Sequence, residues 1–203
     1  QKTLHLKSKP YHLVIEPNFS FKNYLENLSK SLGFKLFMGI ISDEPMYAEI
    51  WRHDKPNKYM NDNIEILRSI PIIEGKEPKK IAKHHEIITL NQFDSIINLE
   101  QKYELKFDTI VADCEGALPY IFEKNPQLFE QIKYIQIEWD CFCSNDNDNF
   151  RQKLLNQGFK SKYTFGVSMF PKWSVENNLC GTTNNVGHEI LVKEEYLYYS
   201  LLK

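Results

Sequence analysis

Apolar residues along this chain fall into short runs, and between several of the runs they recur at helical spacing. The runs are rich in β-branched or aromatic residues and are bounded mostly by polar residues, Gly or Pro, which is the pattern of buried strands. They lie at 12–15, 34–42, 47–51, 86–90, 107–113, 134–138, 159–165 and 188–192. Each of these segments is therefore predicted to form a strand, with 107–113 at the centre of the sheet.

Helical spacing is clearest after the first run. Asn18 or Ser20 is placed to cap a helix that stops at Gly33. The apolar face of this helix is predicted to contain Phe21, Tyr24, Leu25, Leu28 and Leu32.

Three further helices are predicted from capping and proline signals. Thr89 and Gln92 have the spacing of a capping box, Pro119 suits a first helical turn, and Pro126 interrupts the helix that Pro119 begins. The last of the three helices stops at Gly158. The apolar faces of the first and the last are predicted to contain Phe93, Ile96, Ile97, Phe150, Leu154 and Leu155.

Strands that alternate with helices predict an α/β fold, with a mostly parallel, twisted sheet and helices on both faces. The runs 159–165 and 188–192 have no helical pattern between them, so they are expected to form an antiparallel pair at one edge. At 203 residues, the chain is expected to form a single domain, 1–203.

Two polar stretches are predicted to lack regular structure. Segment 52–83 contains Pro and Gly and a basic cluster, and it is either a solvated loop or a flap that supplies Trp51, Arg52 or His53 to a substrate. Segment 144–149, SNDNDN, is interpreted as a solvated turn. His84 and His85 are expected at the surface.

Composition and charge exclude some classes of partner. The net charge of −2 gives no sign of a basic surface that would bind nucleic acid or an anionic membrane. No stretch approaches the roughly 20 apolar residues of a membrane span, and the first residues lack the apolar core of a signal peptide. The four cysteines form no CxxC pair and are interpreted as free thiols. A soluble, intracellular (cytoplasmic) protein is expected.

Acidic residues follow two of the predicted strands directly. Asp113 and Glu115 follow the apolar residues 109–112, and Glu138 and Asp140 follow the apolar residues 134–137. In open α/β sheets, ligands bind outside the carboxyl ends of the strands. These acids either close solvated strand ends or line such a site, and their number, with Gly116 nearby, favours the site.

Five segments, in this order, resemble the FkbM-like family of S-adenosylmethionine-dependent methyltransferases. They are VIEPN at 14–18, FMGIISDE at 37–44, TLNQF at 89–93, FDTIVADCEGA at 107–117 and IKYIQIEWD at 132–140. The resemblance spans about 11–158. It implies a Rossmann-like methyltransferase domain that transfers a methyl group to an oxygen, such as a hydroxyl of a glycan sugar, for example a deoxyhexose such as rhamnose.

The resemblance also implies roles for individual residues. Glu16 is expected to accept hydrogen bonds from the ribose hydroxyls of S-adenosylmethionine, because an ionised carboxylate matches a vicinal diol. The other cofactor-binding residues that it implies are Asn18, Ser42, Asp43, Asp113 and Cys114. Asp113 and Glu115 are expected beside the methyl group and the acceptor.

One element of the family is missing from the sequence. A strand and a glycine-containing loop that wraps the cofactor should precede His12, but only eleven residues do so, and none is glycine. We therefore expect a fragment of a longer, multidomain protein that lacks this strand and loop. The other interpretation is a divergent member that binds the cofactor weakly.

A sugar hydroxyl must lose its proton to attack a methyl group. Asp113, Glu115 or His188 could act as the general base. Alternatively, Asp113, Glu138 and Asp140 could hold Mg²⁺ or Mn²⁺, which lowers the pKa of the hydroxyl. Trp139 could stack on a sugar or belong to the core.

Two alternatives to a sugar methyltransferase follow from the sequence. The first is a methyltransferase of the same fold that acts on another small hydroxylated molecule or on a peptide. The second is a degenerate, non-catalytic module that binds a glycan or a partner, which the missing glycine loop favours.

Overall fold

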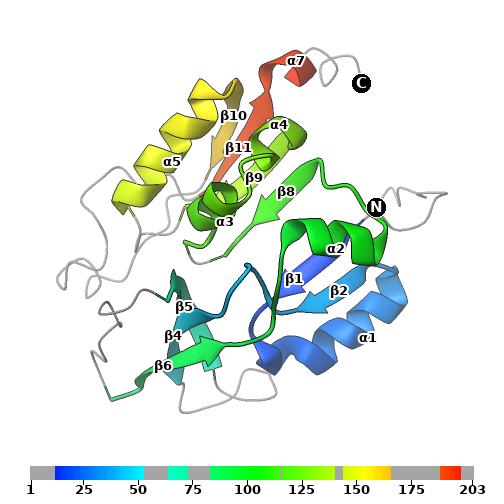
Figure 1. The fold of residues 1–203 in the computed structure, drawn as a ribbon, viewed down its shortest axis with the longest axis vertical. Helices are drawn as coiled ribbons and strands as arrows, with labels where there is room; N and C mark the ends of the chain where they lie inside the picture. The colour runs from blue at the N-terminus through cyan, green and yellow to red at the C-terminus, as the bar shows by residue number, and fades with distance from the viewer. Residues whose placement is uncertain are drawn as a thin grey trace. The chain divides into compact units, whose positions relative to one another are not determined.

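The computed structural model describes residues 12–52, 64–72, 83–114, 116–139, 144–165 and 188–197. The fold is mixed α/β, as predicted, but in place of one mostly parallel sheet the described strands form four small sheets that contain both parallel and antiparallel pairs (Figure 1). The chain divides into two compact units, Gln1–Leu105 and Lys106–Lys203. No helix among the described residues is long and apolar enough to span a membrane.

The first unit begins with a strand, a helix and a parallel strand. β1 (Leu13–Glu16) pairs with β2 (Lys35–Met38), and α1 (Lys22–Leu32) connects them. The side chain of Asn18 accepts a hydrogen bond from the backbone N–H of Ser20 and caps the 3-10 turn η1 (Phe19–Phe21). Gly33 ends α1 with φ of 77°, in the left-handed region. The predicted strand and helix stop are confirmed, whereas Asn18 caps the 3-10 turn that leads into α1 and α1 itself begins after Phe21 without a side-chain cap.

A three-stranded antiparallel sheet follows in the same unit. β4 (Met46–Arg52) lies between β5 (Ile64–Pro71) and β6 (His85–Leu90). The prediction of an irregular segment at 52–83 is wrong where β5 lies. The prediction of a loop relied partly on Pro71. A proline is tolerated in an edge strand, however, because its missing N–H removes no hydrogen bond from the sheet there.

The long run predicted at 34–42 is interrupted at Gly39. Beyond it, β3 (Ile40–Ile41) pairs with β7 (Phe93–Asp94), and the backbone N–H of Ile40 donates to the Gln92 carbonyl at 3.0 Å. A Cβ on Gly39 would lie 2.5 Å from that same carbonyl oxygen and 2.8 Å from the ring of Phe37. The close approach of these two segments therefore requires glycine.

Replacing Gly39 by Ala should lower the free energy of unfolding by about 1–3 kcal/mol, the range for overpacked sites. The backbone oxygen of Gln92 is the closest neighbour, and it cannot rotate away as a side chain could. Chemical denaturation monitored by circular dichroism measures the change. Gly158→Ala is the comparison for backbone strain without overpacking, because a Cβ there meets nothing within 4 Å but its φ of 85° is strained for Ala. Equal stability of Gly39→Ala and the wild type would contradict the packing argument.

Helix α2 (Ile96–Tyr103) completes the first unit. Ser95 caps it, because its hydroxyl accepts from the N–H of Asn98 at 3.2 Å. The predicted capping box at Thr89 and Gln92 is wrong, since Thr89 belongs to β6 and β7 precedes the helix. Helices α1 and α2 lie on opposite sides of the β1–β2 pair (Figure 1).

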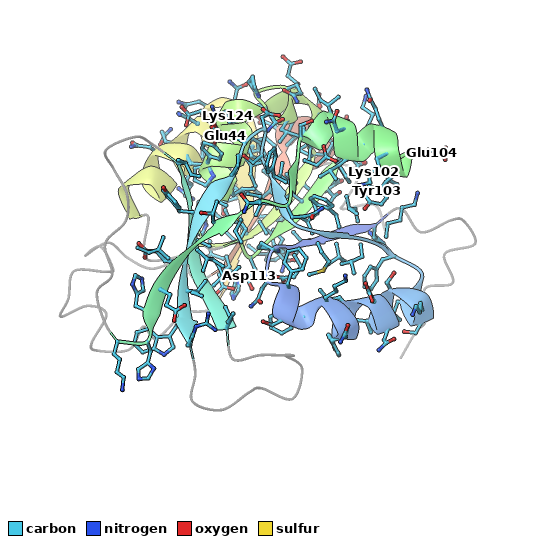
Figure 2. The ribbon with its side chains drawn as sticks, turned by 60° about the horizontal axis from the view of Figure 1, so that its bottom comes forward. Glu44, Lys102, Tyr103, Glu104, Asp113 and Lys124 are labelled. Carbon is cyan, nitrogen blue, oxygen red and sulfur yellow. The ribbon has the colours of Figure 1, made fainter. Side chains whose placement is uncertain are left out.

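Tyr103 joins the end of α2 to β2 (Figure 2). The hydroxyl of Tyr103 donates to the Leu36 carbonyl at 3.0 Å, and the backbone carbonyl of Tyr103 accepts from the ammonium of Lys35. Burial, and secondly the negative charge of Asp94, raise the pKa of Tyr103 above its usual value. Both effects favour the protonated hydroxyl, which is the form that can donate this hydrogen bond.

The second unit contains a four-stranded sheet. β8 (Thr109–Ala112) and β9 (Tyr134–Glu138) are parallel, and β11 (His188–Lys193) lies between β9 and β10 (Phe159–Phe165), antiparallel to both. The predicted antiparallel edge pair is confirmed. β8, which was expected to be central, is the terminal strand of this order.

Helices and an aromatic cluster cover one face of this sheet. α3 (Leu118–Lys124) has Pro119 in its first turn, and Pro126 separates it from α4 (Leu128–Gln131), both as predicted. α5 (Ser144–Asn156) includes 144–149, so the prediction of a turn there is wrong. A short helix, α7 (Glu194–Leu197), follows β11. The rings of Phe122, Phe129 and Phe150 pack together, with centroids 4.8 Å apart for the first pair.

Candidate functional site

Glu16 is the last residue of β1, and its carboxylate is oriented by the chain that follows it. Oε1 accepts a hydrogen bond from the backbone N–H of Asn18 at 2.7 Å. The tight turn after the strand therefore holds the carboxylate at the carboxyl end of a parallel pair. A carboxylate has about four lone-pair sites, so it can accept from Asn18 and from hydroxyl groups of a ligand as well.

Asn18 links this turn to the neighbouring sheet. Its side chain is buried, its Oδ1 accepts from Ser20, and its Nδ2 donates to the carbonyl of Ile64 in β5 at 2.8 Å. One residue thus fixes Glu16, the η1 turn and the start of β5. The sequence predicted Asn18 as a cap and as a cofactor residue, but the bond to β5 joins residues 46 apart and has no local signal.

Ser42 and Asp43 follow β3 in the same unit. Ser42 is buried, its N–H donates to the Asp94 carbonyl at 3.1 Å, and its hydroxyl accepts from the N–H of Glu44 at 3.2 Å. The hydroxyl of Ser42 thus stabilises the turn. Asp43 is exposed at the tip of that turn, where its side chain is accessible to a ligand.

A small pocket lies beside the Glu16 turn. Its volume is about 180 Å³, and Pro17, Asn18 and Phe19 line one side of it. β5, β6 and the segment after β6 supply most of the remaining lining, including Asn91 and Gln92. Sequence reasoning missed this pocket because its walls come from strands that are paired over long sequence distances.

In the second unit, the strand register brings three predicted residues to one edge. Ala112 pairs with Ile137, so Asp113 and Glu138 occupy equivalent positions at the carboxyl ends of β8 and β9. Glu138 in turn pairs with His188, the first residue of β11. His188 Nδ1 lies 3.9 Å from Glu138 Oε2, and both side chains are about one-third exposed. Asp113 is exposed.

The turn after β8 contains a cysteine. Cys114 is half-buried, its carbonyl accepts from the N–H of Ala117 at 3.0 Å, and Gly116 has φ of 78°. Two candidate residues, Glu115 and Asp140, lie outside the described residues. Within the described part of the chain, no three His, Cys, Asp or Glu side chains are grouped so that they could hold a metal ion.

A buried ion-pair network lies next to this edge. Glu189 is fully buried and accepts from Arg151 Nε and Nη2, both at 2.8 Å, and from the indole N–H of Trp139 at 3.0 Å. Burial raises the pKa of Glu189, but hydrogen bonds from Arg151, Ser161 and Trp139 outweigh burial, so the pKa is lowered overall. Trp139 is 9% exposed and therefore belongs to the core.

The sequence held a signal for this network. In the last strand, Glu189 alternates with Leu191 on the inward face, and an acid at an inward position requires a buried partner.

The prediction for His85 is wrong. It was expected at the surface but is fully buried in β6, with Nε2 3.5 Å from Glu49 Oε2.

The predicted site residues form two groups, one in each unit. Glu16, Asn18, Ser42 and Asp43 belong to the first, and Asp113, Cys114, Glu138 and His188 to the second. Comparison with protein-family models, with curated proteins and with solved structures found no match to this chain.

Proposed function

We propose that this chain is a Rossmann-like, S-adenosylmethionine-dependent O-methyltransferase domain that acts on a sugar hydroxyl. One observation carries the proposal. β1 ends in Glu16, whose carboxylate the Asn18 N–H holds at the carboxyl end of a parallel strand pair. That is where α/β folds bind the ribose of a nucleoside cofactor through an acidic residue.

The fold of each unit supports the proposal. β1, α1 and β2 form one parallel strand–helix–strand unit, and β8, α3, α4 and β9 form another. Repeated units of this kind build the doubly wound folds that bind nucleotides. The five motifs of the methyltransferase resemblance fall on the ends of these strands and on the segment after β6.

In the second unit, the sheet edge that carries Asp113, Glu138 and His188 could take up the proton of the acceptor hydroxyl. The acceptor oxygen attacks the methyl carbon, the bond from carbon to sulfur breaks, and the hydroxyl proton must leave. We assign this proton to Nε2 of His188, the ring nitrogen other than the one facing Glu138. Glu138 would stabilise the imidazolium that forms. No step is assigned to a metal ion, since Asp140, one of its three predicted ligands, lies outside the described residues.

Replacing Glu16 by Gln should weaken S-adenosylhomocysteine binding about 10–100-fold. The amide keeps the shape of the side chain but loses the charge, and hydrogen bonds to charged groups contribute about 1.5–3 kcal/mol. Isothermal titration calorimetry of S-adenosylhomocysteine into wild type and variant, each with and without Mn²⁺, measures the change.

The matched control is Glu26→Gln, a half-exposed glutamate on α1 that forms a surface pair with Lys22. Its affinity should equal that of the wild type. A wild-type protein that does not bind S-adenosylhomocysteine would contradict the proposed function and favour a non-catalytic binding module. Equal affinity of Glu16→Gln and the wild type would instead mean that the ribose lies elsewhere.

A further inference from the structure

The pocket beside the Glu16 turn has an uncharged lining. None of the residues that form it is ionisable, although the turn itself begins at Glu16. Moving an ionised group into such surroundings costs several kcal/mol when no counter-charge accompanies it. The lining therefore selects for an uncharged ligand group.

The interior of the pocket is apolar and narrow. Its walls include Ile64, Ile66, Ile88 and Leu90, and its volume is about 180 Å³. An apolar cavity of about 150 Å³ accepts a benzene molecule. The space thus fits one ring, and the rest of a larger ligand would lie outside the pocket.

The rim of the pocket is polar and accessible. Thr89, Asn91 and Gln92 line it and are exposed. Each carboxamide offers two N–H donors and a carbonyl acceptor, which match the mixed donor and acceptor edge of a heteroaromatic ring. Phe19, 47% exposed, lines the same pocket and offers a ring face for stacking.

We propose that this pocket binds one uncharged, flat heteroaromatic ring, with its face against the apolar walls and its polar edge on Asn91 and Gln92. Asn18 lines the pocket and also holds Glu16, so the ring would lie one turn from the carboxylate. The ring can come from two sources: the adenine of the cofactor or a separate small molecule. The site is defined by the pocket, whether or not the chain transfers methyl groups.

The test is a titration of free adenine into ¹⁵N-labelled protein, followed by the side-chain amide signals in heteronuclear NMR spectra. Saturable shifts are expected at Asn91 and Gln92. The double variant Asn91→Ala with Gln92→Ala should bind adenine about tenfold more weakly, since it loses two hydrogen-bonding groups. The control is Gln101→Ala, an exposed carboxamide on α2 that does not line the pocket.

Three results would overturn the proposal: no saturable shift, shifts confined to other parts of the chain, or equal affinity of the double variant and the control. Benzoate, a ring of similar size with a charge, should not bind, and equal binding of benzoate would also overturn it. A second variant, Ile66→Trp, fills the pocket and should abolish adenine binding. Its backbone amide spectrum should remain that of a folded protein.

Competition then distinguishes the two sources of the ring. If S-adenosylhomocysteine displaces adenine, and the double variant weakens both, the pocket holds the cofactor base. If both bind together, the pocket holds the ring of a second ligand. A chain that binds adenine but not S-adenosylhomocysteine would support the pocket while contradicting the proposed methyltransferase.

Discussion

Replacing Arg151 by Ala should lower the free energy of unfolding by about 2–3 kcal/mol at neutral pH. Removing one partner of a buried pair costs about 3–5 kcal/mol because the other charge stays buried and uncompensated. Glu189 is fully buried, but the side chain of Arg151 is 38% exposed, so water screens part of the effect and the expected loss falls below this range. Urea denaturation followed by tryptophan fluorescence measures it.

The loss should depend on pH in a defined direction. The pKa of Glu189 is lowered in the folded chain from its ordinary value of 4.5. Its ion pair therefore contributes stability above about pH 4.5, and this contribution is lost as the pH falls through the folded pKa. The difference between wild type and Arg151→Ala should be largest near neutrality and should shrink in acid.

Two comparisons isolate the network. Lys160→Ala removes an exposed pair with Glu194 in the same unit and should change stability by less than about 1 kcal/mol. A double variant, Arg151→Met with Glu189→Leu, should lose less than Arg151→Ala alone, because no charge stays buried. A pH-independent loss in Arg151→Ala would show that the network does not act through the charge of Glu189.

Replacing His188 by Gln should reduce the turnover number for methyl transfer about 10²–10⁴-fold, the usual contribution of a general base. Glutamine has no proton-accepting nitrogen of suitable basicity, while the strand and its register with Glu138 should persist. The assay measures release of S-adenosylhomocysteine with a set of methyl glycosides, including methyl rhamnoside. Affinity for S-adenosylhomocysteine, by calorimetry, should not change.

His12→Gln is the control, because His12 is an exposed histidine just before β1. It should retain the wild-type rate on the same glycoside. An unchanged turnover number in His188→Gln would remove His188 as the base and leave Asp113, which follows the neighbouring strand β8, as the candidate to vary next. A parallel loss of folded signal would be seen in the circular dichroism spectrum and would separate misfolding from lost catalysis.

Local signals in the sequence were sufficient for most of the elements. The bounds of β9 and β10, the cap at Asn18 and the stops at Gly33 and Gly158 were predicted because strand runs, caps and left-handed glycines depend on near neighbours in the chain. The candidate acids at strand ends were also found in this way. Glu16, Asp113 and Glu138 all end strands or follow them directly.

The errors have one physical cause, which is that pairing partners are distant in the chain. β5 was overlooked because only its pairing with β4 makes a proline-ended segment a strand. Ser95, and not Thr89, caps α2 because Thr89 is paired within β6. The same holds for His85, whose burial depends on the neighbouring strand β4.

The amino-acid pattern alone thus established the mixed α/β class, the strand ends and the acids placed on them. Tertiary structure decided which of these residues meet. Strand register put His188 against Glu138, long-range hydrogen bonds tied Asn18 to β5, and packing buried Glu189 under Arg151 and Trp139. Such contacts join positions tens of residues apart, and no periodicity within a short window of sequence encodes them.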